Sequence, residues 1–355
     1  MNRNRRNPRR AITLVELLMA MIVMVILAAM SWGAMIAAAS QAKIERTRSI
    51  VHKIDQLIMA KWDGYRTRQL PIKIASGTQP RAVAQIRWMA LMELMRMELP
   101  NSKQDILKPA RNNTLDGSYP SWAPSLRSAA LRNAYVRRID AIYGANSFNS
   151  PPMGVPAGDP SPNWPGWTQE NESAECLYLI LACMRDGDTT GLDFLSADEI
   201  GDTDGDGMLE ILDTFGKPIL FVRWPHYYLS DLREKAGNNI TLNFTPTDPI
   251  TPQRSDFPDP FDPLHVASTD LGNPGAHWND KIQPHMLRPL IFSGGPDKIY
   301  AIVSSLPSIA WADVNDPFVG AFAVGSNNVM IGQPFDIDGT GAYADNITNH
   351  DIQAQ

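Results

Sequence analysis

Near its N-terminus the chain has one long segment that carries no charged side chain. The uncharged segment runs for 26 residues, from Leu17 to Ala42. A helix of roughly 20 apolar residues is enough to span a bilayer. Residues 12–42 are therefore predicted to form the membrane-spanning half of an N-terminal helix.

The same helix is predicted to continue beyond the apolar segment with a two-faced pattern. Apolar residues recur at helical spacing, with charged residues between them, at Ile44, Val51, Ile54 and Ile58. This spacing predicts one buried face of an amphipathic helix over residues 43–64. Gly64 and Pro71 are stop signals. The helix as a whole would run from about residue 13 to residue 62, ~75 Å at 1.5 Å per residue.

The rest of the chain changes from helical to β patterns. Within residues 72–190, helical spacing of apolar positions occurs at 81–99, 125–143 and 170–184. Within residues 200–355, short apolar runs between turn residues predict strands at Ile219–Val222, Leu290–Phe292 and Ile299–Val303. The order predicts an α+β fold, in which a long N-terminal helix packs on a small antiparallel sheet and residues 72–190 form a largely helical insertion.

Charge is distributed unevenly along the chain. Of 355 residues, 44% are hydrophobic and 20% are charged, and the formal net charge is −6. Residues 1–11 contribute five arginines and no acid, so the remaining chain carries −11. Basic residues before an apolar helix stay in the cytoplasm. We expect a single-pass inner-membrane protein with an extracytoplasmic body, and the acidic body gives no reason to expect nucleic acid as a partner.

Glu16 is an unusual residue at the start of the apolar segment. A carboxylate at membrane depth costs several kcal/mol unless it is paired, so it is read as functional by default. A new amino terminus, created by cleavage just upstream, would supply the positive partner.

Residues 9–18 read Arg-Arg-Ala-Ile-Thr-Leu-Val-Glu-Leu-Leu. They resemble the processing site of type IV pilins and type II secretion pseudopilins. In that family a prepilin peptidase cuts on the cytoplasmic side, and the new first residue becomes N-methylated. Carried over, the cut falls between Ala11 and Ile12, residues 1–11 are a basic leader peptide, and Glu16 is the fifth mature residue. The family usually has glycine at the position of Ala11 and phenylalanine at that of Ile12. The resemblance implies a pilin-like fold and pairing of Glu16 with the Ile12 ammonium of a neighbouring subunit.

Three later segments are similar, in the same order, to motifs of major pseudopilins. The first, Asp213–Ile219, resembles a segment that starts a strand. The second, Ser293–Asp297, resembles a turn between later strands, and the third, Asp345–Ile347, resembles the closing segment of the chain. The resemblance implies a pseudopilin-like domain over residues 200–355. Residues 72–190 have no counterpart in that plan, which favours an insertion.

The segment Asp202–Asp213 has the oxygen spacing of a twelve-residue calcium loop. The six predicted ligands are the carboxylates and one main-chain carbonyl of Asp202, Asp204, Asp206, Met208, Glu210 and Asp213. Gly207 stands at the sharp turn. An aspartate closes the loop where glutamate is usual, and Pro218 is unfavourable for a following helix. A solvated acidic turn, with Asp213 serving the turn into the next strand, stays the alternative to calcium.

An enzyme is not expected. The chain has no H-E-x-x-H, G-x-S-x-G, G-x-x-x-x-G-K-[ST] or G-x-G-x-x-G sequence, and its six histidines are scattered. Cys176 and Cys183 are seven positions apart, ~10 Å along a helix, which is too far for a disulfide.

The sequence favours a structural subunit of a pilin-like filament, either a type II secretion pseudopilus or a type IV pilus-like assembly. Its implied partners are like subunits, a prepilin peptidase and an inner-membrane assembly platform with its ATPase. The alternative is a signal-anchored extracytoplasmic binding module that depends on calcium. That module would keep its leader and would not depend on Glu16.

Overall fold

In the computed structural model the chain forms two compact units, Met1–Glu45 and Arg46–Gln355. The residues that the structure describes are 13–70, 72, 74, 76–107, 129–144, 164, 166–168, 170–225, 228, 259–262, 287–304, 331, 332, 334 and 344–353.

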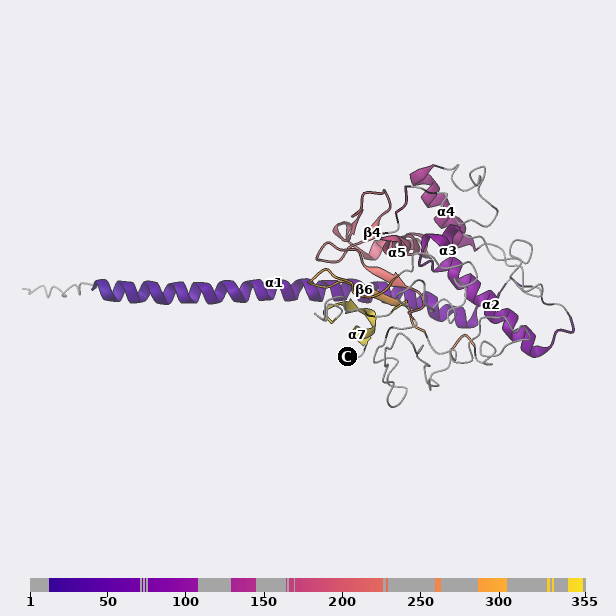
Figure 1. Ribbon diagram of the computed structural model, residues 1–355, viewed down its shortest axis with the longest axis horizontal. Helices are drawn as coiled ribbons and strands as arrows, with labels where there is room; N and C mark the ends of the chain where they lie inside the picture. Colours follow the sequence, from indigo (N-terminus) through magenta and orange to yellow (C-terminus); the bar gives the residue numbers. More distant parts are fainter. Residues whose placement is uncertain are drawn as a thin grey trace, which may run out of the picture. The chain divides into compact units, whose positions relative to one another are not determined.

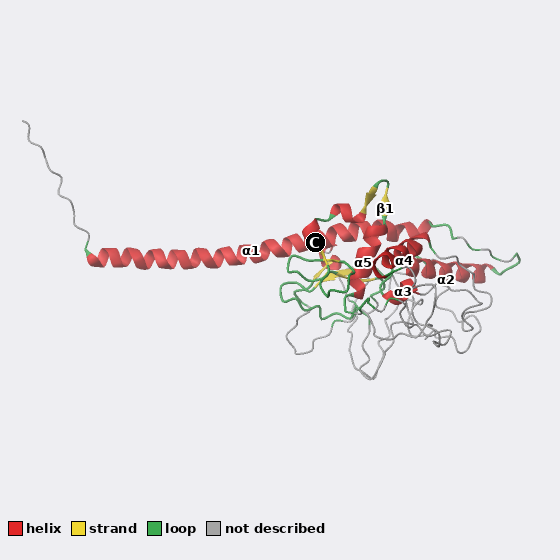
Figure 2. Cartoon of the chain, turned by 90° about the horizontal axis from the view of Figure 1, so that it is seen from above, coloured by secondary structure: helices red, strands yellow, loops and turns green. Residues whose placement is uncertain are grey.

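Helix α1 runs without interruption from Leu14 to Gly64, as Figures 1 and 2 show. In the first unit its large apolar side chains, between Leu14 and Ile36, are 50% to 80% exposed. Among the described residues it is the one helix long and apolar enough to cross a membrane. So much exposed apolar surface suits lipid better than water.

The part of α1 that belongs to the second unit has the buried face predicted for it. Val51, Ile54 and Ile58 are fully buried, at 0% exposure. Thr47, Asp55 and other residues of the same face are buried with them. A short 3-10 turn, η1 (Tyr65–Thr67), follows the helix. The amphipathic pattern is therefore satisfied by packing within this unit.

Three described helices of the body follow the predicted segments: α2 (Pro80–Glu98), α4 (Ala130–Tyr143) and α5 (Glu172–Cys183). Two short helices, α3 (Lys103–Leu107) and α7 (Asn349–Gln353), were not predicted. Pro80 is tolerated in the first turn of α2 because its missing N–H would have no partner there. The predicted start of the second helix, at 125–128, lies outside the described residues. Both cysteines are free, as expected from their spacing.

The main sheet has three antiparallel strands in the order β5-β6-β7. These are β5 (Leu220–Val222), β6 (Leu290–Ser293) and β7 (Ile347–Thr348). Phe221 pairs with Ile291, and Phe292 pairs with Thr348. Two hairpins, β1 (Arg185–Asp186) with β2 (Thr189–Thr190) and β3 (Ile200–Gly201) with β4 (Glu210–Ile211), precede this sheet. The 3-10 turns η2 (Gly191–Phe194) and η3 (Ala197–Glu199) lie between the hairpins. The α+β class is confirmed.

The predicted strand Ile299–Val303 is wrong. Within it, Ile302 makes an isolated bridge to Pro334, and no strand is formed. Lys298 and Ala301 have φ angles of 66° and 44°. These left-handed conformations break the extended backbone that a strand needs.

Helix α5, which lies within the predicted insertion, packs directly against β4 and β5. Ala174 joins the apolar core formed with residues of β5 and β6, such as Leu220 and Phe292. The hydroxyl of Ser173 accepts a hydrogen bond from the N–H of Phe221 at 2.9 Å and donates to its carbonyl oxygen. Among the described residues, α5 of the predicted insertion therefore shares the core of the sheet.

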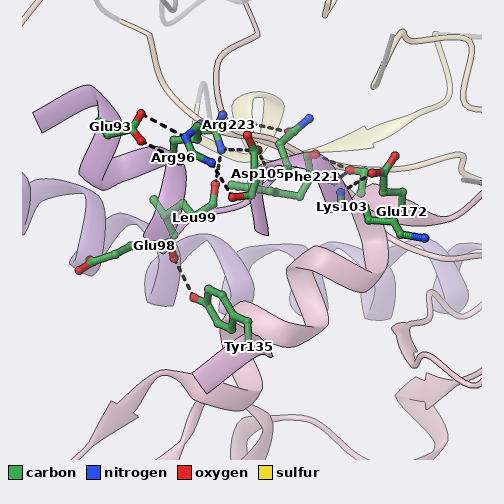
Figure 3. Close-up of polar contacts among 12 residues, drawn as sticks. Glu93, Arg96, Glu98, Leu99, Lys103, Asp105, Tyr135, Glu172, Phe221 and Arg223 are labelled. Carbon is green, nitrogen blue, oxygen red and sulfur yellow. Dashed lines mark hydrogen bonds and ion pairs between the residues drawn. The ribbon is translucent and has the colours of Figure 1, made fainter. Parts of the chain in front are cut away.

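A buried polar network joins α2 and α3 to the end of β5 (Figure 3). Arg96 pairs with Glu93 at 2.7 Å and donates to the carbonyl oxygen of Asp105 at 2.6 Å. Arg223 pairs with the Asp105 carboxylate at 2.8 Å. A buried charge that loses its partner is costly, so these pairs strongly disfavour other arrangements of the helices on the strand.

Candidate functional site

The described part of the chain begins at Thr13, and the predicted processing residues Ala11 and Ile12 lie outside it. Thr13 is the N-cap of α1. Its N–H and its hydroxyl donate to one oxygen of the Glu16 carboxylate, at 3.0 and 3.2 Å, and its hydroxyl oxygen accepts from the N–H of Glu16 at 3.3 Å. This reciprocal arrangement is a capping box, and it supplies partners for N–H groups at the helix start.

The capping box gives Glu16 a defined place. The carboxylate lies in the first turn of α1, where the helix dipole favours negative charge, and the exposed apolar side chains follow it. The capping role of Thr13 was not predicted, although the T-x-x-E spacing from Thr13 to Glu16 is a recognised signal of a helix start. Because α1 begins at Leu14, the predicted cut precedes the helix.

The first part of the predicted calcium loop is a tightly turned connection between β3 and β4. The Asp202 carboxylate accepts hydrogen bonds from the N–H groups of Gly205 and Gly207, at 2.7 and 3.1 Å. Both glycines have positive φ angles, 79° and 97°, which other residues rarely adopt. The turn gathers one carboxylate oxygen each from Asp202, Asp204 and Asp206 within 4.8 Å of one another.

A second acidic group shares Asp204 with the first and reaches into the interior. One carboxylate oxygen each of Glu175, Asp204 and Glu210 lie within 4.8 Å of one another. Glu175, from α5, and Glu210, from β4, are both 0% exposed. The indole N–H of Trp167 donates to Oε2 of Glu175. The other oxygen, Oε1, is buried and has no hydrogen-bond partner in the described part of the chain.

The surroundings of these carboxylates disfavour their negative charge. Burial, together with the charges of Asp206, Asp204 and Glu210, raises the pKa of Glu175 to about 9. Burial, with the charge of Asp204, raises the pKa of Glu210 to about 7. Lys103 lies close enough to be attracted by Glu175, but its ammonium donates to the carbonyl oxygens of Trp164 and Trp167, at 2.6 and 2.8 Å. This arrangement suits a hard cation or a shared proton.

Two of the six predicted calcium ligands, Met208 and Asp213, belong to neither group of three carboxylates. Met208 was predicted to bind through its main-chain carbonyl; its side chain is buried, and its main-chain N–H donates to Asp206 at 2.8 Å. Asp213 is not in either acidic group. One of its oxygens accepts from the N–H groups of Phe215 and Lys217, at 2.8 and 2.9 Å, and the other accepts from the Ser293 hydroxyl at 2.6 Å. Both oxygens of the Asp213 carboxylate thus accept hydrogen bonds, from the turn into β5 and from Ser293. The buried Glu175 takes a place in the acidic group that no local spacing could reveal.

The three segments that resemble pseudopilin motifs meet in the structure. Ser293 connects the first to the second through its bond to Asp213. The N–H of Asp297 donates to the Asp345 carboxylate at 3.4 Å, which connects the second to the third. Gly295, at φ +65°, faces the backbone of Asp345 so closely that a Cβ would collide with its carbonyl oxygen. These segments form one corner at the end of the sheet.

Comparison with known proteins identifies only the start of the chain. No curated protein and no solved structure matches it. Residues 6–32 match the family model of the prokaryotic N-terminal methylation motif. The match covers the predicted cut, Glu16 and the first half of the apolar segment. The chain therefore begins with a type IV pilin-like prepilin signal, which marks it as a precursor for a prepilin peptidase and supplies an apolar, membrane-anchoring helix.

Proposed function

We propose that this chain is a structural subunit of a pilin-like filament, a type II secretion pseudopilus or a type IV pilus-like assembly. The observation that carries the proposal is where the methylation motif lies. It opens a continuous helix, Leu14–Gly64. The first part of that helix exposes apolar side chains, and its last part supplies core residues to the body. Such a helix can hold a precursor in lipid and later pack against like helices.

The proposed sequence of events begins in the inner membrane. Leu17–Ala42 holds the precursor there, with the body on the extracytoplasmic side. A prepilin peptidase removes residues 1–11, and Ile12 becomes a charged amino terminus. An inner-membrane platform then moves the subunit from lipid into the filament. The meeting of Asp213, Ser293 and Asp345 supports a pseudopilin-like body.

Glu16 is the assembly residue in this proposal. In the described structure both Thr13 bonds go to Oε2, and Oε1 of Glu16 accepts no hydrogen bond. The carboxylate can therefore keep its helix cap and still receive the Ile12 ammonium of a neighbouring subunit. Such a pair, once shielded from water, would set the register between subunits.

The test is to produce the chain together with a prepilin peptidase and an assembly platform. The N-terminus is read by intact-mass spectrometry, and filaments are counted by electron microscopy. We expect a mature chain that begins at N-methylated Ile12. Glu16→Ala should leave the body folded but reduce filaments by more than about tenfold, because a shielded charge without its partner costs several kcal/mol. Glu45→Ala, an exposed acid farther along α1, is the matched control and should assemble normally.

Two results would overturn the proposal in different ways. A chain that still begins near Met1 would favour the signal-anchored extracytoplasmic binding module. Normal filaments from Glu16→Ala would leave processing intact but remove the pairing role of Glu16.

A further inference from the structure

Glu175 has surroundings that the filament proposal does not explain. Its side chain is 0% exposed at the start of α5. One carboxylate oxygen accepts from the Trp167 indole, and Oε1 has no hydrogen-bond partner in the described part of the chain. A buried polar atom without a partner is expensive, so its retention calls for a missing ligand.

The carboxylates around Glu175 increase this cost. Asp204 and the fully buried Glu210 each bring an oxygen within 4.8 Å of the Glu175 carboxylate. Asn171 donates to Glu210 at 3.2 Å, and the N–H of Thr203 donates to it at 3.0 Å. These neutral donors do not balance charge, and no described lysine or arginine forms an ion pair with the three acids.

The chemistry of the available donors limits which cation fits. The three candidate ligands are all carboxylate oxygens, and no histidine or cysteine belongs to the group. Oxygen-only sites suit Ca²⁺, Mg²⁺ or Mn²⁺ and do not favour Zn²⁺. Calcium binds oxygen at 2.3–2.6 Å, so ligands on opposite sides of it lie about 5 Å apart. The carboxylate oxygens of Glu175, Asp204 and Glu210 lie within 4.8 Å of one another, which fits that span. Asp202 and Asp206, gathered beside Asp204, offer the further oxygens that calcium needs.

We propose that Glu175, Asp204 and Glu210, with Asp202 and Asp206 beside them, bind a calcium ion that ties the first turn of α5 to the β3–β4 hairpin. The site differs from a linear twelve-residue loop because Glu175 comes from a helix and Asp213 takes no part. Its effect is structural: the ion joins α5, which packs on the sheet, to the β3–β4 hairpin, which precedes the sheet in the chain. The site does not depend on whether the chain forms filaments.

The test uses the full chain in detergent, stripped of metal with a chelator. Calcium is titrated from about 10 µM to about 10 mM. This range covers the dissociation constants of extracellular calcium sites and reaches those of tighter sensor sites. Binding is followed by calorimetry and stability by thermal unfolding. Calcium should raise the midpoint of unfolding. Glu175→Gln should weaken calcium binding by at least about tenfold, because it removes a charged ligand.

The variant also has a signature that a merely structural role would not produce. Without metal, Glu175→Gln should be at least as stable as the natural chain, because its amide can donate to the neighbouring carboxylates. With calcium, the order of stability should reverse. Asp188→Asn, at an exposed acid outside the group, is the matched control and should bind calcium as the natural chain does. Asp204→Asn, at the residue shared by both acidic groups, should also lose binding.

Several outcomes would overturn the site. An unchanged unfolding midpoint at about 10 mM calcium would mean that a proton, not a metal, balances the carboxylates. Loss of binding in Asp213→Asn with retention in Glu175→Gln would assign calcium to the linear loop. Equal affinity for Mg²⁺, which demands a tighter octahedral shell, would reduce the group to a diffuse acidic patch.

Discussion

His350 in α7 shows how burial sets the chemistry of a single residue. Its ring meets Tyr228 edge-on, with centroids 5.3 Å apart, and its Nε2 lies 3.1 Å from the carbonyl oxygen of Pro289. Burial lowers the pKa of His350 to about 4; the charge of Arg288 adds to this effect and that of Asp55 opposes it. The folded protein keeps the ring neutral at a pH where the unfolded chain protonates it.

The stability of the protein should therefore fall on acidification. The pKa of His350 is about 6.5 in the unfolded chain and about 4 in the folded protein, so protonation between these values favours the unfolded chain. The stability that His350 contributes is fully present above about pH 6.5. It is lost progressively as the pH falls to about 4, by about 3 kcal/mol in total. His350→Gln should flatten this acid limb when the free energy of unfolding by urea is measured at pH 7 and pH 5. The exposed His52, changed to Gln, controls for loss of a histidine; an equally steep limb in His350→Gln would contradict the prediction.

At the scale of elements, the second half of α1 is held by polar contacts as well as by its apolar face. Asp55, at 2% exposure, pairs with Arg288 at 3.0 Å and accepts from the Asn349 amide at 2.7 Å. Asn349 in turn accepts from the N–H of Ile291 in β6 at 2.9 Å. One carboxylate on α1 thus connects the helix to β6 and α7.

Removing that carboxylate should weaken the whole junction. Asp55→Ala leaves a partly buried guanidinium and an amide without their acceptor, so we expect a loss of about 2 to 4 kcal/mol in unfolding free energy. Asp63→Ala removes an exposed acid from the same helix, 3.6 Å from Arg66, and should change stability by less than about 0.5 kcal/mol. Chemical denaturation of both variants measures the difference. Similar losses in the two variants would show that Asp55 is not a connecting residue.

At the scale of the whole molecule, Arg46–Gln355 is a compact unit with its own core. Ile50, Val51, Ile54 and Ile58 on α1 belong to that unit and are almost wholly buried. The body should need this part of α1 and should not need the apolar segment before it.

A chain that begins at Lys43 should accordingly fold, remain soluble and unfold cooperatively. A chain that begins at Met59 lacks four buried aliphatic side chains, each worth about 2–5 kcal/mol, and that loss matches the whole stability of an ordinary domain. Circular dichroism and thermal unfolding compare the two truncations. If the chain that begins at Lys43 is already unfolded, the body is not independent of the membrane segment.

Local patterns in the sequence were enough to predict much of this protein. The uncharged segment, the amphipathic spacing after it and the strands at Leu220 and Leu290 depend on neighbours only a few residues away, so periodicity and turn residues reveal them. The prepilin signal is likewise a local sequence, and it could be recognised without the fold. The capping pair of Thr13 and Glu16 has the same local character, because its T-x-x-E spacing can be read from four consecutive residues.

Tertiary structure alone decided what depends on residues far apart in the chain. The apolar run at Ile299 has the composition of a strand, but left-handed backbone at Ala301 takes it out of the sheet. Asp213 has the right spacing for calcium, yet its oxygens are taken up by the turn into β5 and by Ser293. Glu175 joins Asp204 and Glu210 only because α5 packs on β4. Spacing along a chain sets which groups can meet locally, whereas the packing of a helix on a strand decides which distant carboxylates share one buried space.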